Sequence, residues 1–436
     1  MRSNEAVGGG DVVGEELAAV LARLGELADL PTDAAALPAD AGAELIDRIA
    51  VLEKVRAAVA AAQHTAMVAF GRVQVEEQTT EVAAGRLDPR KLGKGIADQI
   101  ALAVHVSPTT GSRRLGIARA LDSDLPETRR LLVAGRISER LAETVVSETS
   151  HLDPDTRRLV DKQLTDAGLD GLGFARAEAT VKNRAYEADK AGSLARGRKA
   201  RTDRRVTLRP APDTMSVLSA LLPVEQGVAC QVALRRHADS LIATGDTDGR
   251  TRDQLMADTL VERVLGQKAA TDVDVEVGIV VPVDLLIDPD SPATGDLVGH
   301  GPVPGGIVRD LLASTGGKRW WRQLFSHPRH GTLVGGDPTR RLFDGFLAQL
   351  IDLRDGGRCR DPYCDAPIRH RDHIIQSRAG GPTSFTNGRG VCARGNFVRE
   401  MPGWQVHTVH DGLSDQPHTV ETTTPTGHTY TSRAGP

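Results

Sequence analysis

Aromatic residues are scarce in this sequence: Phe, Trp and Tyr together make up 3% of its 436 residues. Its cores must therefore be built from Ala, Leu, Val and Ile, a filling that helices accommodate better than sheets do. The sequence contains no run of about 18 apolar residues, so we expect no membrane span and no membrane partner. Residues 1–10 lack the apolar centre of a secretory signal, and the expected location is the cytoplasm.

Cysteine is also rare. The chain has four cysteines, and three of them, Cys359, Cys364 and Cys392, fall within 34 positions near its C-terminal end. So few thiols argue against a disulfide scaffold, and their clustering favours a metal site in a reducing compartment. Cys230 stands alone in an apolar stretch, and we expect it to be a small core residue.

The first half of the chain is predicted to be almost entirely helical. Residues 1–13 are rich in glycine and are predicted to be disordered, whereas from 14 to 195 apolar residues recur at helical spacing. Ser107 followed by Pro108 is an N-cap with a favoured first helical residue, so one helix should begin there, and Ser138 should open another that runs to about Val146. The polar stretch near 74–90 should interrupt the second predicted helix. The two short helices around Ser107 could form a DNA-facing helix-turn-helix or belong to an ordinary bundle.

Residues 196–316 are predicted to continue this helical domain as an α+β segment. Between 196 and 209 seven basic residues accompany one acidic residue, which fits either a phosphate-contacting arm or a solvated linker. The Pro, Gly and Asp residues of 288–301 indicate a boundary or an exposed loop. Residue spacing predicts helices over 215–222, 228–244, 252–265 and 306–314, and a strand over 273–281. Gly266 is the expected C-cap of the helix over 252–265.

A separate module is predicted over residues 317–410. It should contain a strand pair, 320–325 with 331–334, followed by a helix over 340–353. From 318 to 400 there are 15 Lys and Arg against 8 Asp and Glu, a balance of about +7 in a chain whose net charge is −4. Such a local excess of basic residues is typical of a surface that binds a polyanion.

Residues 411–436 are predicted to form a β-hairpin tail, because alternating residues flank the turn sequence Pro425-Thr-Gly. The histidines in and just before the tail are expected to be exposed: His407, His410, His418 and His428.

The cysteines of the module have a spacing compatible with one tetrahedral metal ion, since four residues separate Cys359 from Cys364. Cys392 should begin a helix and could supply a third thiolate. A structural zinc ion needs four ligands, but the residue at the expected fourth position is Gly395, which has no side chain. Either the knuckle is free of metal and held by packing, or another residue substitutes: His370, Asp361 or Asp365.

A second polar group lies between these cysteines. Asp372 and His373 are adjacent at a predicted strand end, where one could hold Mg²⁺ or Mn²⁺ and the other could act as a general base. Asn387 lies in a predicted turn and should brace the loop through backbone bonds. Asn396 could offer its amide oxygen to the cation. The alternative is a surface hairpin with incidental polar residues.

The order Cys-x4-Cys, Asp-His, Gly-Gly-Pro, Asn, Cys-x3-Asn and Met401-Pro-Gly-Trp404 resembles the signature of HNH endonucleases. From about residue 15 onward the chain also resembles bacterial proteins that join this module to a long helical domain, the domain-of-unknown-function family 222 or 13E12-repeat proteins. Ala257-Asp258-Thr-Leu-Val261, the 273–277 strand and the 422–433 tail contribute to that likeness.

The resemblance implies a mainly α N-terminal region with a small α+β segment, then a C-terminal ββα-metal (HNH) module and a β-hairpin tail. It implies His373 as general base and Asn387 as the residue that positions the loop, with Asp372 and Asn396 as ligands of Mg²⁺ or Mn²⁺. Structural Zn²⁺ would lie on the three clustered cysteines. Two positions depart from the signature: Asn396 stands where histidine is usual, and Gly395 stands where a zinc ligand is usual.

The expected activity is therefore metal-dependent hydrolysis of DNA. The basic side chains around the signature are predicted to contact the DNA: Arg369, Arg371, Arg378, Arg389 and Arg394. The competing hypotheses are a catalytically degenerate DNA-binding protein that retains the HNH fold, and an interaction protein built on the helical region. The sequence gives no prediction of the oligomeric state.

Overall fold

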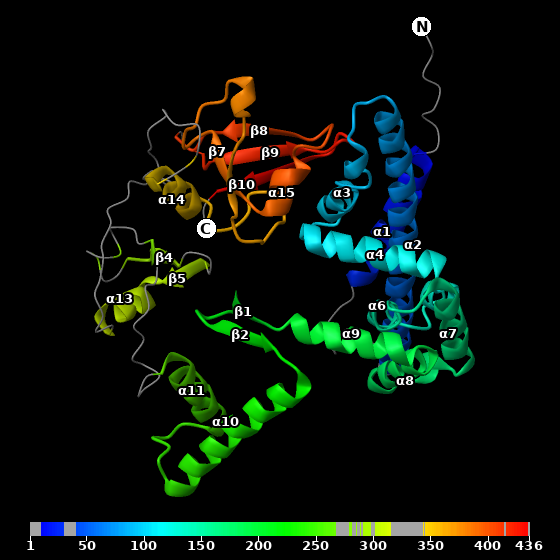
Figure 1. Ribbon diagram of the computed structural model, residues 1–436, viewed down its shortest axis with the longest axis horizontal. Coiled ribbons are helices and arrows are strands. Elements are labelled where there is room, and N and C mark those ends of the chain that lie inside the picture. Colours follow the sequence, from blue (N-terminus) through cyan, green and yellow to red (C-terminus); the bar gives the residue numbers. More distant parts are fainter. Residues whose placement is uncertain are drawn as a thin grey trace.

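The computed structural model describes residues 10–29, 41–266, 279–280, 285, 288, 291–297, 301–314, 343, 345–413 and 416–434. The protein is mainly helical, with small antiparallel sheets and a sheet region at its C-terminal end (Figure 1). The strand pair predicted over 320–325 and 331–334 lies outside the described residues, as does most of the strand predicted over 273–281.

The N-terminal half is a helical region, as predicted. Helix α1 begins at Gly10, inside the stretch predicted to be disordered. The elements are α1 (Gly10–Ala28), α2 (Ala41–Ala83), η2 (Pro89–Lys91), α3 (Ile96–Ala103), α4 (Pro108–Ser123), α5 (Pro126–Val133), α6 (Glu139–Glu148), α7 (Pro154–Asp166), η3 (Leu169–Gly171), α8 (Phe174–Ala188) and α9 (Lys190–Thr202).

The predicted break in the second helix is wrong, because α2 continues to Ala83. The side chain of Gln78 accepts from Gly93 N at 2.7 Å and donates to Lys94 O at 3.0 Å. Glutamine and glutamate are good helix formers, so a polar stretch need not end the helix. Here the side chain of Gln78 binds the backbone of the segment that follows α2.

The caps at Ser107 and Ser138 are local and as expected: their hydroxyl oxygens accept from Thr110 N and Leu141 N. Helix α4 packs along α2 and α3, which supports the bundle interpretation of this helix pair.

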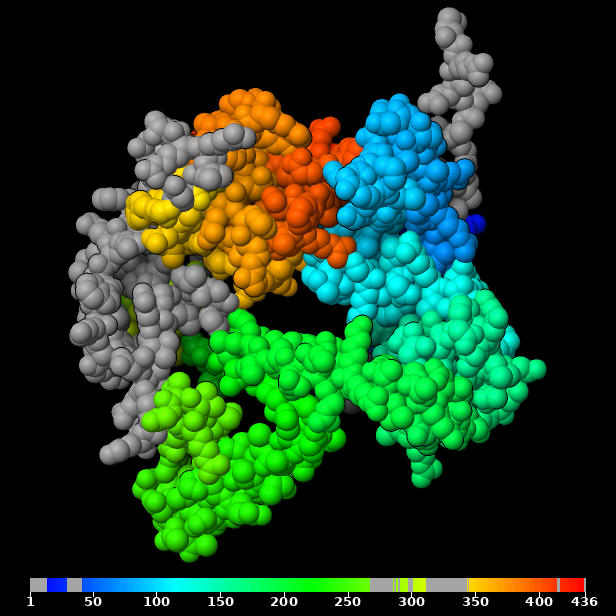
Figure 2. Space-filling model, in the orientation of Figure 1, coloured from blue at the N-terminus to red at the C-terminus, as the bar shows by residue number. Residues whose placement is uncertain are grey.

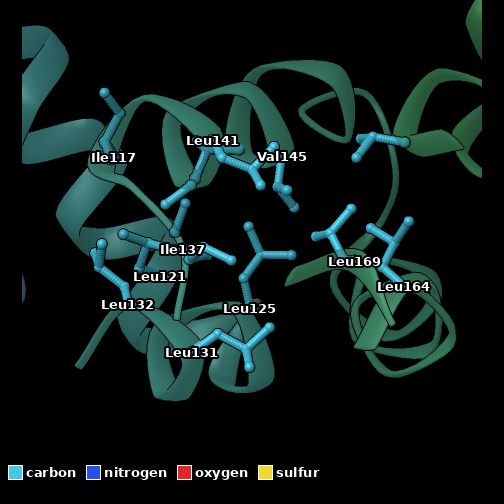
Figure 3. Close-up of a cluster of buried hydrophobic side chains, with 14 of the residues drawn as sticks. Ile117, Leu121, Leu125, Leu131, Leu132, Ile137, Leu141, Val145, Leu164 and Leu169 are labelled. Carbon is cyan, nitrogen blue, oxygen red and sulfur yellow. The ribbon is translucent and has the colours of Figure 1, made fainter. Parts of the chain in front are cut away.

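The main core is formed mainly by the successive helices α4 to α8, whose leucines converge (Figure 3). The side chains of Leu125, Leu131 and Leu164 are fully buried in it. Helix α5 has no side-chain cap of its own. Instead Asp161 of α7 accepts from Glu127 N at 2.7 Å and Thr128 N at 3.0 Å. A helix distant in sequence thus supplies hydrogen-bond acceptors for the free backbone N–H groups at the start of α5.

The middle of the chain leaves the bundle through α9 and forms an arm, green in Figures 1 and 2. The arm contains β1 (Arg205–Pro210) paired with β2 (Ser216–Leu221), followed by the antiparallel helices α10 (Val224–Thr244) and α11 (Arg252–Leu265). The predicted helix over 215–222 is wrong: Leu218 pairs with Leu208 in an antiparallel ladder. Cys230, expected in a core, is exposed on α10.

The basic stretch 196–209 spans the end of α9 and most of β1, and its residues from 197 onward are exposed to solvent. Gly266 ends α11 in the left-handed conformation (φ 69°), as its predicted C-cap role requires.

A small three-stranded sheet follows, in the order β3-β4-β5, with β3 (Ile279–Val280), β4 (Thr294–Leu297) and β5 (Gly301–Pro304). Strand β4 lies within 288–301, so the loop predicted there is partly strand. Helix α13 (Gly305–Ser314) packs on β4 and β5, close to its predicted limits.

The C-terminal part consists of α14 (Gly345–Arg354), β6 (His370–His373), η4 (Ser377–Ala379), β7 (Gly388–Val391), α15 (Ala393–Val398), β8 (Gln405–His410), β9 (Thr419–Thr423) and β10 (Thr429–Arg433). The predicted hairpin is confirmed as β9 and β10, and β8 extends it to an antiparallel sheet of order β10-β9-β8.

His407 and His428 are exposed and His410 is partly exposed, but the prediction is wrong for His418. His418 is fully buried, and its Nε2 contacts Thr386 O at 2.9 Å. Burial lowers the pKa of His418 to about 3, so the ring is a neutral interior group that joins the tail to the loop before β7.

Candidate catalytic and metal site

The candidate site is built on two short strands and the helix that follows them. Strands β6 and β7 are antiparallel, with Asp372 opposite Arg389 and His373 opposite Gly388. Helix α15 begins directly after β7 and contacts both strands. This arrangement places Asp372 and His373 at the end of β6, in a strand pair that α15 packs against.

His373 is a half-buried histidine with a fixed ring. Its Nε2 lies 2.9 Å from the hydroxyl of Thr383, and its ring centroid lies 4.5 Å from that of Phe343. Burial lowers the pKa of His373, the carboxylate of Asp372 opposes that shift, and Arg399 adds to it. A ring with a lowered pKa is neutral at neutral pH and can accept a proton.

Asp372 is paired with arginines. Arg399 donates to Asp372 Oδ2, and Nη2 of Arg389 lies 3.7 Å from the same oxygen. Both arginines approach the same carboxylate oxygen, Oδ2. Asn396 lies on α15, on the helix that contacts β6, and is partly exposed. The carboxylate of Asp372 and the amide of Asn396 therefore come from adjoining elements.

Asn387 makes the backbone bonds that were expected of it. Its Oδ1 accepts from Ile375 N at 2.8 Å, while Nδ2 donates to Ile375 O at 3.0 Å and to Pro382 O at 2.8 Å. Its backbone O also accepts from Ile374 N at 2.8 Å. The side chain thereby ties both ends of the loop between β6 and β7 together, beside His373.

The three clustered cysteines come together in the interior. The sulfur atoms of Cys359, Cys364 and Cys392 lie within 4.8 Å of one another, and Cys364 Sγ is 3.9 Å from Cys392 Sγ. Contacts from the other two thiols lower the pKa of Cys392, and Gly395 N donates to its sulfur at 3.3 Å. Thiolates at this separation can bind one soft or borderline metal ion such as zinc.

Two of the predicted DNA-contacting arginines are exposed, and one is partly exposed. Arg369 precedes β6, and Arg378 lies in η4, where its Nη2 is 3.3 Å from Glu400 Oε2. Arg371 is partly exposed and paired with Asp352. These side chains stay candidates for phosphate contacts.

The other two arginines are paired with carboxylates of the protein, and of the two only Arg389 is fully buried. Arg389 is 0% exposed, and its Nη1 donates to Asp361 Oδ1 at 2.7 Å. This interior ion pair takes the place of the DNA contact predicted for Arg389. Arg394 on α15 donates to Asp98 Oδ1 at 2.6 Å, to Asp98 Oδ2 at 2.8 Å and to Ser112 Oγ at 2.8 Å, so its guanidinium faces the helical region.

Sequence reasoning missed a buried charge network under the site. Asp355, at the end of α14, accepts from Arg354 Nε at 2.8 Å, from Arg360 Nη1 at 3.2 Å and from Gly390 N at 2.7 Å. Arg360 also donates to Ser432 O at 2.7 Å, so one network joins α14, β7 and β10. Charged residues at the end of an apolar helix are usually exposed to solvent. The sequence therefore gives no sign that Arg354, Asp355 and Arg360 are buried.

The helical region and the site-bearing unit touch each other directly. In Figure 2 the blue and cyan N-terminal part adjoins the orange and red C-terminal part. Asp98 of α3 holds Arg394 of α15, and the rings of His105 and Tyr363 stack with centroids 4.4 Å apart. The contacts of Arg394 with Asp98 and Ser112 fix the position of α15 relative to α3 and α4.

Asp98→Ala should destabilise this junction by about 1–3 kcal/mol, because Arg394 would lose its carboxylate partner in a half-buried setting. Urea unfolding and limited proteolysis would measure the effect. Asp122→Ala is the matched control on α4, since its partner Arg72 is mostly exposed and the pair should contribute less than about 1 kcal/mol. Equal losses for the two variants would contradict the assignment.

A comparison with protein families identifies the larger part of the chain. A family model described as "Domain of unknown function (DUF222)" matches residues 46–355. The protein belongs to the DUF222 family. The DUF222 match ends just before Cys359, so the cysteine cluster and the Asp-His pair lie beyond it. No curated protein and no solved structure matches this DUF222 chain.

Within the described residues of this DUF222 protein, no helix combines the length and apolar character needed to cross a bilayer.

Proposed function

We propose that this DUF222 protein is a metal-dependent HNH endonuclease that hydrolyses DNA phosphodiester bonds. The observation that carries the proposal is the placement of His373. It is a neutral, half-buried histidine at the end of β6, beside a loop tied together by Asn387, and on a unit covered by α15. A ββα-metal module needs this succession of strand, loop, strand and helix.

In the proposed reaction His373 takes a proton from water, and the water oxygen attacks the phosphorus. The bond from phosphorus to one ester oxygen breaks, and that oxygen leaves with the electron pair and takes a proton from solvent water. Thr383 and Phe343 hold the imidazole ring in place for the transfer. A divalent cation held by Asp372 and Asn396 would stabilise the charge that develops on the phosphate. Arg369 and Arg378 would contact the DNA backbone.

The site is also compatible with a DNA-binding protein that does not cleave. The observation favouring this second candidate is the pairing of Asp372 with Arg399 and Arg389, which already neutralises the carboxylate that a cation would use. In that case the basic module would bind DNA through counterion release alone.

A nicking assay separates the two candidates. The full chain is incubated with supercoiled plasmid in Mg²⁺, in Mn²⁺ and in EDTA, and binding is measured in parallel at several salt concentrations. The nuclease proposal expects nicked or linear plasmid with either cation and none in EDTA. Salt-sensitive binding without any cation-stimulated cleavage would overturn it and support the second candidate.

A further inference from the structure

The cysteine cluster has three ligands where a structural zinc ion takes four. Gly395, three residues after Cys392, has no side chain to offer. Its backbone is helical and does not have a positive φ, so the conformation itself would accept another residue. What occupies the space beside Gly395 therefore decides how the site is completed.

That space is filled by Asp361. A Cβ atom placed on Gly395 would lie 1.8 Å from Asp361 Oδ2 and 2.9 Å from Asp361 Cγ. No side chain at position 395 can coexist with the carboxylate in this position. The carboxylate of Asp361 thus lies where the side chain of a ligand at position 395 would project.

Two of the distances within this group of side chains are those of a zinc site. Asp361 Oδ2 is 3.6 Å from Cys359 Sγ, and Cys364 Sγ is 3.9 Å from Cys392 Sγ. Tetrahedral zinc with ordinary bond lengths separates an oxygen and a sulfur ligand by roughly 3.6 Å, and two sulfurs by roughly 3.8 Å. The three sulfurs lie within 4.8 Å of one another, whereas Asp361 approaches them from the side of Cys359 and is not within 4.8 Å of all three. Zinc binding would therefore draw the carboxylate further toward Cys364 and Cys392.

The second carboxylate oxygen of Asp361, Oδ1, accepts a hydrogen bond from a buried arginine. Arg389, which is 0% exposed, donates to Asp361 Oδ1 at 2.7 Å. Metal-bound carboxylates are commonly oriented by such a partner, and the guanidinium also offsets part of the negative charge of three thiolates and a carboxylate. The other sequence candidates, Asp365 and His370, are exposed, unlike the three buried cysteines.

We propose that Asp361 is the fourth ligand of a Cys3Asp zinc site and that Gly395 is its necessary counterpart, because only glycine leaves room for the carboxylate. This inference concerns the metal site alone and holds whether or not the protein cleaves DNA.

A four-variant comparison on the full chain tests the proposal: wild type, Asp361→Ala, Gly395→Cys and the double variant. Zinc content and affinity are measured by chelator competition, and the ligand set is read from the absorption spectrum of the Co²⁺-substituted protein. We expect one zinc ion per wild-type chain and at least about tenfold weaker binding in Asp361→Ala. Gly395→Cys should also bind more weakly, because the new side chain collides with Asp361.

The double variant keeps the test decisive if a single variant folds poorly. With the carboxylate removed, the thiol introduced by Gly395→Cys has room to bind, so zinc affinity should recover and the Co²⁺ spectrum should gain sulfur-to-metal charge-transfer intensity. Asp365→Ala is the matched control and should bind zinc as the wild type does. Three results would overturn the proposal: no zinc in the wild type, undiminished affinity in Asp361→Ala, or no recovery in the double variant.

Discussion

His373→Ala should slow cation-dependent DNA cleavage by about 10²–10⁴-fold, the usual contribution of a general base. The expectation follows from the environment of the ring: it is half-buried, contacts the Thr383 hydroxyl and has a lowered pKa. DNA binding should change little, because the proposed role concerns proton transfer. Initial nicking rates in Mg²⁺, together with binding at fixed salt, would measure both quantities.

The pH dependence gives a second readout. A base acts in its neutral form, so the cleavage rate should rise with pH and level off once the ring is neutral. Because burial lowers the pKa of His373 below 6.5, the midpoint of this rise should lie below pH 6.5.

His370→Ala is the matched control, since His370 is an exposed histidine at the other end of β6. Its cleavage rate should stay near that of the wild type. If His373→Ala nicks plasmid as fast as the wild type, the general base has been assigned to the wrong residue.

Asp355→Ala should destabilise the C-terminal part by about 3–5 kcal/mol, the largest stability effect we expect. The carboxylate is fully buried between Arg354 and Arg360, and its removal would leave both guanidinium groups without their buried counter-charge. Gly390 N on β7 would lose its acceptor as well. Denaturant unfolding followed by a probe in the C-terminal part would measure the loss.

The same network predicts an acid sensitivity. Burial raises the pKa of Asp355, but Arg354, Arg360 and the N–H of Gly390 outweigh burial, and the net pKa is lowered. A carboxyl whose folded pKa is lowered stabilises the protein above its unfolded pKa. That contribution should be lost as the pH falls below about 4.

Asp365→Ala is the matched control for stability, because Asp365 is an exposed carboxylate in the same segment. It should change the free energy of unfolding by less than about 0.5 kcal/mol. A loss in Asp355→Ala no larger than this control would show that the buried arginines are satisfied in some other way.

Sequence-local signals predicted much of the helical region. The caps at Ser107 and Ser138 bond to backbone groups three residues away, and Gly266 needs only its own left-handed conformation. Interactions of such short range are encoded within one turn of chain, which is why spacing and residue type suffice to predict them.

The failures involve partners far along the chain. Leu218 is extended because it pairs with Leu208, whereas its apolar spacing alone favoured a helix. His418 is buried because the loop before β7 closes over it, and Arg389 is interior because Asp361 and Asp372 surround it. Residue type and spacing do not reveal a partner that long-range packing supplies.

The sequence by itself determined the residue types of the candidate site: the three cysteines, the Asp-His pair and the two asparagines, in an order that resembles HNH nucleases. Only the tertiary structure decided which groups meet. It placed Asp361 in the space beside Gly395, bound Asp372 to arginines and turned Arg394 toward Asp98. The physical reason is range: ligand chemistry is a property of single residues, whereas the partner of a buried charge depends on how distant segments pack together.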